Sequence, residues 1–159
     1  MPISNPPSVP ESRIKVVRKT TDEVVNNSDV LQDDDELFFA IDANDVYFVD
    51  VYLFVYTIGL ATDFKFDVSG PAGASFKQYK QYSKWDRIDV GTTPASIETT
   101  MATNSGGRGG DTDFGLAFHF LVINGANGGN VNLRWAQNAA AVENTIVRAN
   151  SFILTYKLN

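Results

Sequence analysis

The sequence has 159 residues, enough for one domain with a sizeable hydrophobic core. It contains no cysteine, which excludes a disulfide scaffold, a thiol nucleophile and a cysteine-ligated metal site. The formal net charge is −6, and residues 20–63 hold eleven acidic side chains and no basic one. A chain with this balance is a poor nucleic-acid binder, because phosphates attract basic surfaces.

Residues 1–12 contain four of the six prolines. Proline lacks the N–H that a sheet interior requires, so we predict an extended N-terminal arm over 1–12 and a single β-domain over 13–159. The start of the chain has no basic region followed by an apolar one, and no apolar stretch is long enough to span a bilayer. We therefore expect a soluble protein that is made in the cytoplasm and has no membrane partner.

The rest of the chain has the pattern of short strands separated by turns. Residues 13–19 predict a first strand with a basic outer face, residues 23–25 a short second strand, and residues 37–41 a third. The aspartates at 33–35 are expected to form a solvated loop.

Residues 46–58 form the strongest predicted strand, and both of its faces are apolar. One face carries Val46, Phe48, Tyr52, Phe54, Tyr56 and Ile58, interrupted only by Asp50. A strand that is wet on one side normally alternates with polar residues. We therefore predict that Phe48, Tyr52, Phe54 and Tyr56 lie in the core or against another subunit.

The later segments continue the strand pattern. Residues 63–68 should point Phe64, Phe66 and Val68 inward. Residues 75–85 fit a helix or a twisted strand, with strand favoured, and residues 88–101 fit one or two strands. Further strands are predicted over 114–123, 131–135, 144–148 and 151–158, with Val131, Leu133 and Trp135 sharing one face. About eight to ten strands without a long helix predict an all-β antiparallel sandwich or jelly roll.

The candidates for chemistry are weak. The one histidine, His119, stands between two phenylalanines in a predicted strand, and no partner for general base catalysis is apparent nearby. We expect no enzyme activity and no catalytic, cofactor or metal site. Residues 33–36 could bind calcium, although a solvated turn is favoured. One group of aromatic and basic residues suits either a sugar-binding platform or an interface or core, and the second role is favoured: Tyr79, Tyr82 and Trp85 with Lys77, Lys80, Lys84 and Arg87.

Four segments carry a family resemblance. They are VNLRWAQN at 131–138, TIVRANSF at 145–152, LFFAI at 37–41 with the aromatics at 47 and 48, and DFKF at 63–66 before Gly70 and Pro71. Together they resemble virion proteins of tailed bacteriophages, in which L-x-W-A-Q-N is followed by T-x-V-x-x-G-S-x-L. The sequence departs at Asn150, where glycine is expected, but asparagine tolerates a left-handed backbone.

The resemblance implies a trimeric sandwich or jelly roll in a phage particle. It implies that Trp135 is a core anchor and that Gln137 and Asn138 satisfy backbone groups where a strand leaves the sheet. The expected function is that of a non-enzymatic, homotrimeric capsid decoration (cement) protein that stabilises the outer capsid surface.

The expected partners are further copies of the chain and the major capsid protein. The expected location is the virion, after synthesis in the host cytoplasm. A tail or fibre module that binds a host-surface glycan is the alternative. The predicted capsid contacts are Ile3 and Val9 of the arm and the basic residues Arg13, Lys15, Arg18 and Lys19.

Overall fold

The computed structural model describes residues 13–58, 64–79, 97–98, 104–105 and 112–159. These residues form β-strands joined by turns and loops. The strands are β1 (Ile14–Arg18), β2 (Glu23–Asn26), β3 (Gln32–Ile41), β4 (Val46–Thr57), β5 (Phe64–Ser69), β6 (Ser75–Tyr79), β7 (Ile97–Glu98), β8 (Asn104–Ser105), β9 (Thr112–Ile123), β10 (Gly129–Gln137), β11 (Asn144–Val147) and β12 (Phe152–Lys157). Among the described residues, no helix has the length and apolarity needed to cross a bilayer.

The strands make two antiparallel sheets. The large sheet has the order β1-β12-β4-β9-β6-β7, with β11 also paired to β4 and β2 paired to β11. The small sheet has the order β3-β10-β5-β8. Successive strands from β3 to β6, and again from β8 to β11, alternate between the two sheets. This crossing pattern is that of a jelly roll, so the predicted fold class is confirmed.

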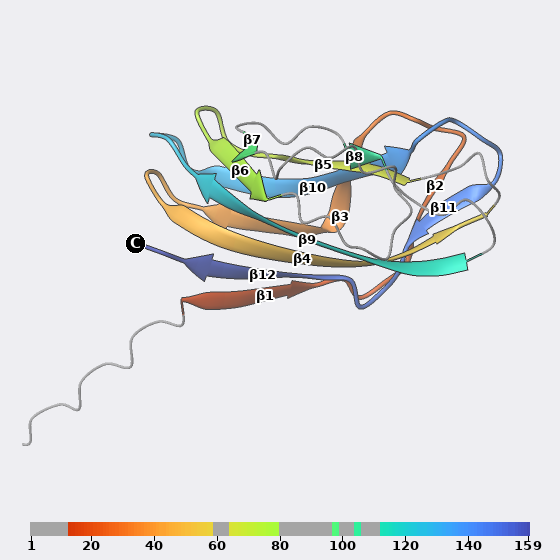
Figure 1. Ribbon diagram of the computed structural model, residues 1–159, viewed down its shortest axis with the longest axis horizontal. Helices are drawn as coiled ribbons and strands as arrows, with labels where there is room; N and C mark the ends of the chain where they lie inside the picture. Colours follow the sequence, from red (N-terminus) through yellow and green to blue (C-terminus); the bar gives the residue numbers. More distant parts are fainter. Residues whose placement is uncertain (1–12, 59–63, 80–96, 99–103, 106–111) are drawn as a thin grey trace, which may run out of the picture.

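Figure 1 shows β1 and β12 side by side along one border of the molecule. They pair from Ile14 opposite Tyr156 to Arg18 opposite Phe152, so the start of β1 lies close to the C-terminus. Since β1 pairs only with β12 among the described strands, it is an edge strand of the large sheet.

The core lies between the sheets and follows the period of two in each strand. β4 alternates without a break, burying Tyr47, Val49, Val51, Leu53 and Val55. β9 runs beside it over all twelve residues of each strand, which makes this pair the centre of the large sheet.

The inward faces predicted for the other strands are also confirmed. Phe64, Phe66 and Val68 of β5 are buried, as are Val131, Leu133 and Trp135 of β10. On β9, Phe120 and Val122 are buried, and Phe114, Leu116 and Phe118 pack against the core.

β3 departs from the prediction. The aspartates at 33–35 are part of the strand, not a solvated loop before it, and Asp34 is buried. The pairing of β3 with β10 shifts between Asn132 and Arg134, which face Phe38 and Asp33. This bulge breaks the alternation and turns Asp34 inward.

Two local predictions about the C-terminal third are confirmed. Asn150 has a φ of 72°, the left-handed conformation expected where the related pattern has glycine. The Gln137 side-chain oxygen accepts hydrogen bonds from the backbone N–H groups of Ser28 and Ala141, and its amide donates to the Glu143 carbonyl oxygen. Gln137 thus closes the loop where β10 ends, whereas Asn138 is exposed.

Candidate functional site

The outward side of the large sheet is the main candidate for an interaction surface. The side chains that alternate with the buried ones on β1, β12, β4 and β9 all point to this side. We use the name aromatic face for the following apolar side chains among them: Ile14, Val16, Phe48, Tyr52, Phe54, Tyr56, Leu121, Phe152, Leu154 and Tyr156. Val16 is 61% exposed, Phe54 46% and Tyr52 37%, so the apolar surface is open to solvent in the single chain.

The rings of the aromatic face pack side by side across the strands. Tyr52 stacks on Phe152 with ring centroids 4.8 Å apart. Phe48 lies between Tyr156 at 6.0 Å and His119 at 5.7 Å. Ring pairs at these distances hold one another in place, so the face is a preformed surface.

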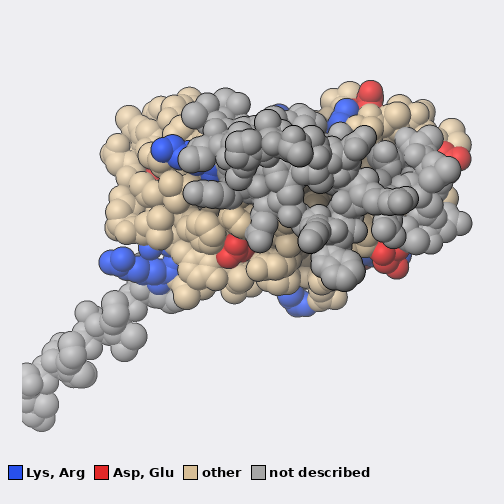
Figure 2. Space-filling model, viewed as in Figure 1, with Lys and Arg blue, Asp and Glu red and all other residues tan. Residues whose placement is uncertain are grey.

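Few charged side chains share this face, and one of them is the exposed Arg18, which lies opposite Phe152. Asp50 of β4 lies directly opposite His119 of β9 in the strand register, and both are half-buried. At one end Arg148 lies 4.8 Å from the centroid of the Tyr56 ring and pairs with Asp22 and Asp113. On the side that Figure 2 shows, most of the described surface is uncharged, and basic side chains gather over the start of β1.

The residues predicted to lie either in the core or at a subunit interface therefore separate into two groups. Phe48, Tyr52, Phe54 and Tyr56 lie on the aromatic face, at the position expected for a subunit contact. Trp135 is fully buried between the sheets and belongs to the core.

The residues predicted to contact the capsid also differ in their exposure. Arg13, Lys15 and Arg18 are exposed on or beside β1, whereas Ile3 and Val9 lie outside the described residues. The prediction for Lys19 is wrong, because Lys19 has no exposed surface. Its ammonium group points into the molecule and cannot meet an external partner.

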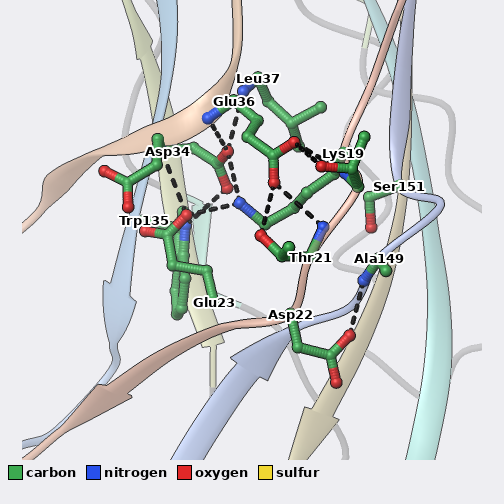
Figure 3. Close-up of polar contacts among 12 residues, drawn as sticks. Lys19, Thr21, Asp22, Glu23, Asp34, Glu36, Leu37, Trp135, Ala149 and Ser151 are labelled. Carbon is green, nitrogen blue, oxygen red and sulfur yellow. Dashed lines mark hydrogen bonds and ion pairs between the residues drawn. The ribbon is translucent and has the colours of Figure 1, made fainter.

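Lys19 is the centre of a buried cluster that joins the two sheets (Figure 3). Its Nζ lies 2.8 Å from Asp34 Oδ1 and 2.5 Å from Glu23 Oε2. The side chains of Lys19 and Asp34 are 1% and 0% exposed, and that of Glu23 is 11% exposed.

The Asp34 carboxylate has further donors. Oδ1 accepts the backbone N–H groups of Glu36 and Leu37 at 2.9 and 2.8 Å, and Oδ2 accepts Trp135 Nε1 at 3.1 Å. This set of donors satisfies a carboxylate that burial alone would destabilise.

The charges in the cluster shift one another's pKa values. Burial raises the pKa of Glu23, and the nearby Asp34 charge adds to that effect, outweighing the hydrogen bond from Lys19. Burial lowers the pKa of Lys19, but its hydrogen bonds to Asp34 and Glu23 outweigh burial and raise it. The resting Lys19 is therefore an ammonium group beside two carboxyl groups.

Sequence reasoning missed this cluster because its members look like surface residues. Lys19 ends a basic run and Asp34 stands in an acidic run, and both kinds of run are usually solvated. The bulge in β3 that turns Asp34 inward leaves no mark on the hydrophobic period. The only available signal was that Lys19 is the last basic residue before residues 20–63, which hold eleven acidic side chains and no basic one.

The sequence offered two alternative sites, a calcium site and a sugar-binding platform, and the structure bears on only the first. Asp34, which a calcium site over 33–36 would need, is committed to Lys19 and Trp135. No group of three or more histidine, aspartate or glutamate side chains in the described ranges is placed to hold a metal ion. The sugar platform cannot be placed, because Lys80, Tyr82, Lys84, Trp85 and Arg87 lie outside the described residues.

No protein-family profile matches the chain, and no curated protein sequence matches it. Among solved structures, the chain is similar to one of infectious bursal disease virus, Gt strain, with 12% identity and a TM-score of 0.46. That match covers 99% of this chain but only 38% of the viral one. The chain is also similar to an Eiger TNF structure from S. frugiperda, with 12% identity and a TM-score of 0.39, over 89% of this chain and 94% of that one. Both likenesses are remote, and the jelly-roll fold rests on the strand order of this chain.

Proposed function

We propose that the chain is a non-enzymatic virion structural protein that forms a homotrimer and decorates the outer surface of a capsid. The aromatic face carries this proposal. Solvent-exposed sheet faces are normally polar, and large exposed apolar patches mark interaction sites. The occupant we assign to the face is a second copy of the chain.

The size of the aromatic face suits a stable contact between copies. β4 and β9 pair over twelve residues, and β12 and β1 add shorter strands on one side. With a rise of about 3.3 Å per residue and a strand spacing of about 4.8 Å, the face covers roughly 600 Å² in projection. A standard protein interface buries about 800 Å² on each partner, so the face is of the right order.

The composition also favours self-association. Tyrosine and phenylalanine are enriched at interface centres, where charged residues are depleted. A cyclic trimer has contacts in which two different patches of each subunit meet. The aromatic face is of the right size for one of these two patches.

The setting in a phage particle is supported by the resemblance of residues 36–158 to tailed-phage virion proteins. The exposed Arg13, and Lys15 and Arg18 of β1, follow directly after the proline-rich residues 1–12. A basic strand next to the arm can meet an acidic capsid surface. Three such contacts in one trimer would act with a high effective concentration.

Two measurements test the proposal. Sedimentation equilibrium of the purified protein should give about three chains per particle, the closed cyclic assembly proposed here. A monomer at micromolar concentration would contradict it. The trimer should also bind capsids that lack it, and deletion of residues 1–12 should weaken that binding without changing the melting temperature. Binding to host-surface glycan but not to capsids would favour the tail or fibre alternative.

A further inference from the structure

The buried cluster around Lys19 has the features of a site for covalent bond formation. An amine and a carboxyl group are in contact, water is excluded, and a second carboxyl group touches the amine. The pair joins the end of β1 in the large sheet to β3 in the small sheet, 15 residues apart in sequence.

The backbone holds both reacting groups in place. The Lys19 N–H donates to the Ser151 carbonyl oxygen, and the Lys19 carbonyl oxygen accepts from the Asn150 N–H, both at 2.8 Å. Asp34 is held by the N–H groups of Glu36 and Leu37. Groups fixed in contact in this way react as though at very high concentration, with effective molarities of about 10⁵ M or more.

We propose that Lys19 and Asp34 condense within the folded chain to form an isopeptide bond, with Glu23 carrying the protons. The bond that forms joins Lys19 Nζ to Asp34 Cγ, and the bond that breaks joins Cγ to one carboxylate oxygen. The ammonium group gives up two protons, and that oxygen leaves with both as water. The step needs no oxidant, reductant or activating nucleotide.

Glu23 is positioned for the proton transfers. Its Oε2 lies 2.5 Å from Lys19 Nζ, and the Asp35 N–H donates to the same oxygen at 3.1 Å. Burial raises the pKa of Glu23, so its carboxylate accepts a proton more readily than an exposed glutamate does. Transfer of a proton from the ammonium group to Glu23, and from Glu23 to an Asp34 oxygen, gives the neutral amine and the carboxylic acid that it attacks.

The donors around Asp34 suit the intermediate of this attack. As Lys19 adds to Cγ, negative charge gathers on the Asp34 oxygens. Trp135 Nε1 and the N–H groups of Glu36 and Leu37 already point at those oxygens. Preorganised donors in a dry site stabilise such charge more strongly than water does.

A second lysine–aspartate pair in the chain shows which features set the site apart. Lys157 Nζ lies 2.8 Å from Asp45 Oδ2, the same separation as in the buried pair. The Lys157 side chain is 34% exposed, and no second carboxylate makes an ion pair with it among the described residues. We therefore expect no bond between Lys157 and Asp45.

The bond would fix an edge strand of the sandwich. β1 is an edge strand with a single described strand partner, β12, and residues 1–12 precede it. A covalent link from Lys19 to β3 would transmit force on the N-terminal residues to the small sheet. It would also remove two buried charges.

Intact-mass spectrometry of the purified full-length protein tests the inference. We expect a mass lower than that of the sequence by one water molecule. In fragmentation spectra, backbone cleavage between 19 and 34 should give no separated ions, because the isopeptide bond still joins the two parts. A wild-type protein that keeps its full mass after long incubation would overturn the proposal, whatever its variants do.

Three variants locate the chemistry. Lys19→Arg and Glu23→Gln should each have the full mass of their sequences, whereas the matched control Lys157→Arg should still lack one water. Loss of water that persists in Lys19→Arg would overturn the proposal. Persistence in Glu23→Gln would overturn the role given to Glu23. The assembly state of the protein is a separate measurement, so this result is independent of the proposed function.

Discussion

The outer face of the small sheet is a polar surface, whereas the outer face of the large sheet presents stacked rings. On the small sheet Arg134 and Asp67 form a two-pronged ion pair, and Asn132 lies opposite Ser69. On the large sheet the equivalent positions of β4 are Phe48, Tyr52, Phe54 and Tyr56, with Asp50 among them. Strand geometry is the same in both sheets, so it does not explain why one outer face is polar and the other apolar. The difference in side chains reflects what each face contacts. One suits water, and the other suits a protein partner.

Removing the rings at the centre of the aromatic face should have the largest effect. We predict that the double variant Tyr52→Ser, Phe54→Asp weakens self-association at least about 100-fold, because a buried interface aromatic contributes roughly 2 kcal/mol or more. Sedimentation across a concentration series measures this change.

The small sheet offers a matched control for that variant. Phe38 is 42% exposed, close to the 46% of Phe54, but it lies on the polar face. Phe38→Asp should leave the assembly state unchanged. Equal weakening by both changes would contradict the assignment of the contact to the large sheet.

Substitutions of Trp135 test how much the core between the two sheets contributes to stability. Trp135→Ala should lower the free energy of unfolding by roughly 3–5 kcal/mol, because it deletes a fully buried ring. Trp135→Phe keeps most of that volume but leaves Asp34 without one donor, so it should cost about 1–3 kcal/mol. Denaturant titrations measure both values. A cost below about 1 kcal/mol for the alanine variant would place Trp135 outside the core.

The ion pair on the polar face should contribute less. Arg134 is 36% exposed and Asp67 is 9% exposed at the side chain. Arg134→Ala should lower stability by about 0.5–1 kcal/mol, the upper range for a solvent-screened pair, and should not change assembly. A loss of the trimer in this variant would show that the small sheet also contacts a partner.

Glu36 gives a smaller effect that depends on pH. Side-chain and backbone hydrogen bonds from Thr20, joined by those from Thr21, lower the pKa of Glu36 from 4.5 to about 2. A carboxyl group with a lowered folded-state pKa stabilises the fold above its unfolded pKa and loses that contribution as pH falls through the folded pKa. The melting-temperature difference between wild type and Glu36→Gln should therefore be full at neutral pH and shrink between pH 4.5 and about 2.

An exposed glutamate in the turn before β11 provides the comparison for this measurement. Glu143→Gln should not reproduce the acid-range change, because it leaves the donors of Thr20 and Thr21 in place. A Glu36→Gln protein whose melting curve follows the wild type at every pH would contradict the role given to these hydrogen bonds.

The sequence by itself determined most of the described strands and their inward faces, but not that β3 begins at Gln32. Val49, Val51 and Leu53 of β4, like Phe64 and Phe66 of β5, follow a period of two that depends only on local strand geometry. The same period revealed that β4 is apolar on both sides. The left-handed Asn150 and the loop-closing Gln137 were expected from the family resemblance, although Gln137 also bonds Ser28, 109 residues away in sequence.

Only the tertiary structure decided which charged side chains are buried. Lys19 and Asp34 are buried because the chain brings the residue after β1 against a bulge in β3 and places Trp135, 101 residues beyond Asp34, beside Asp34. Whether a charge can be buried depends on partners that are distant in sequence, and the hydrophobic pattern carries no information about them. The tertiary structure also showed that the second apolar side of β4 faces outward, since that depends on which sheet covers which face.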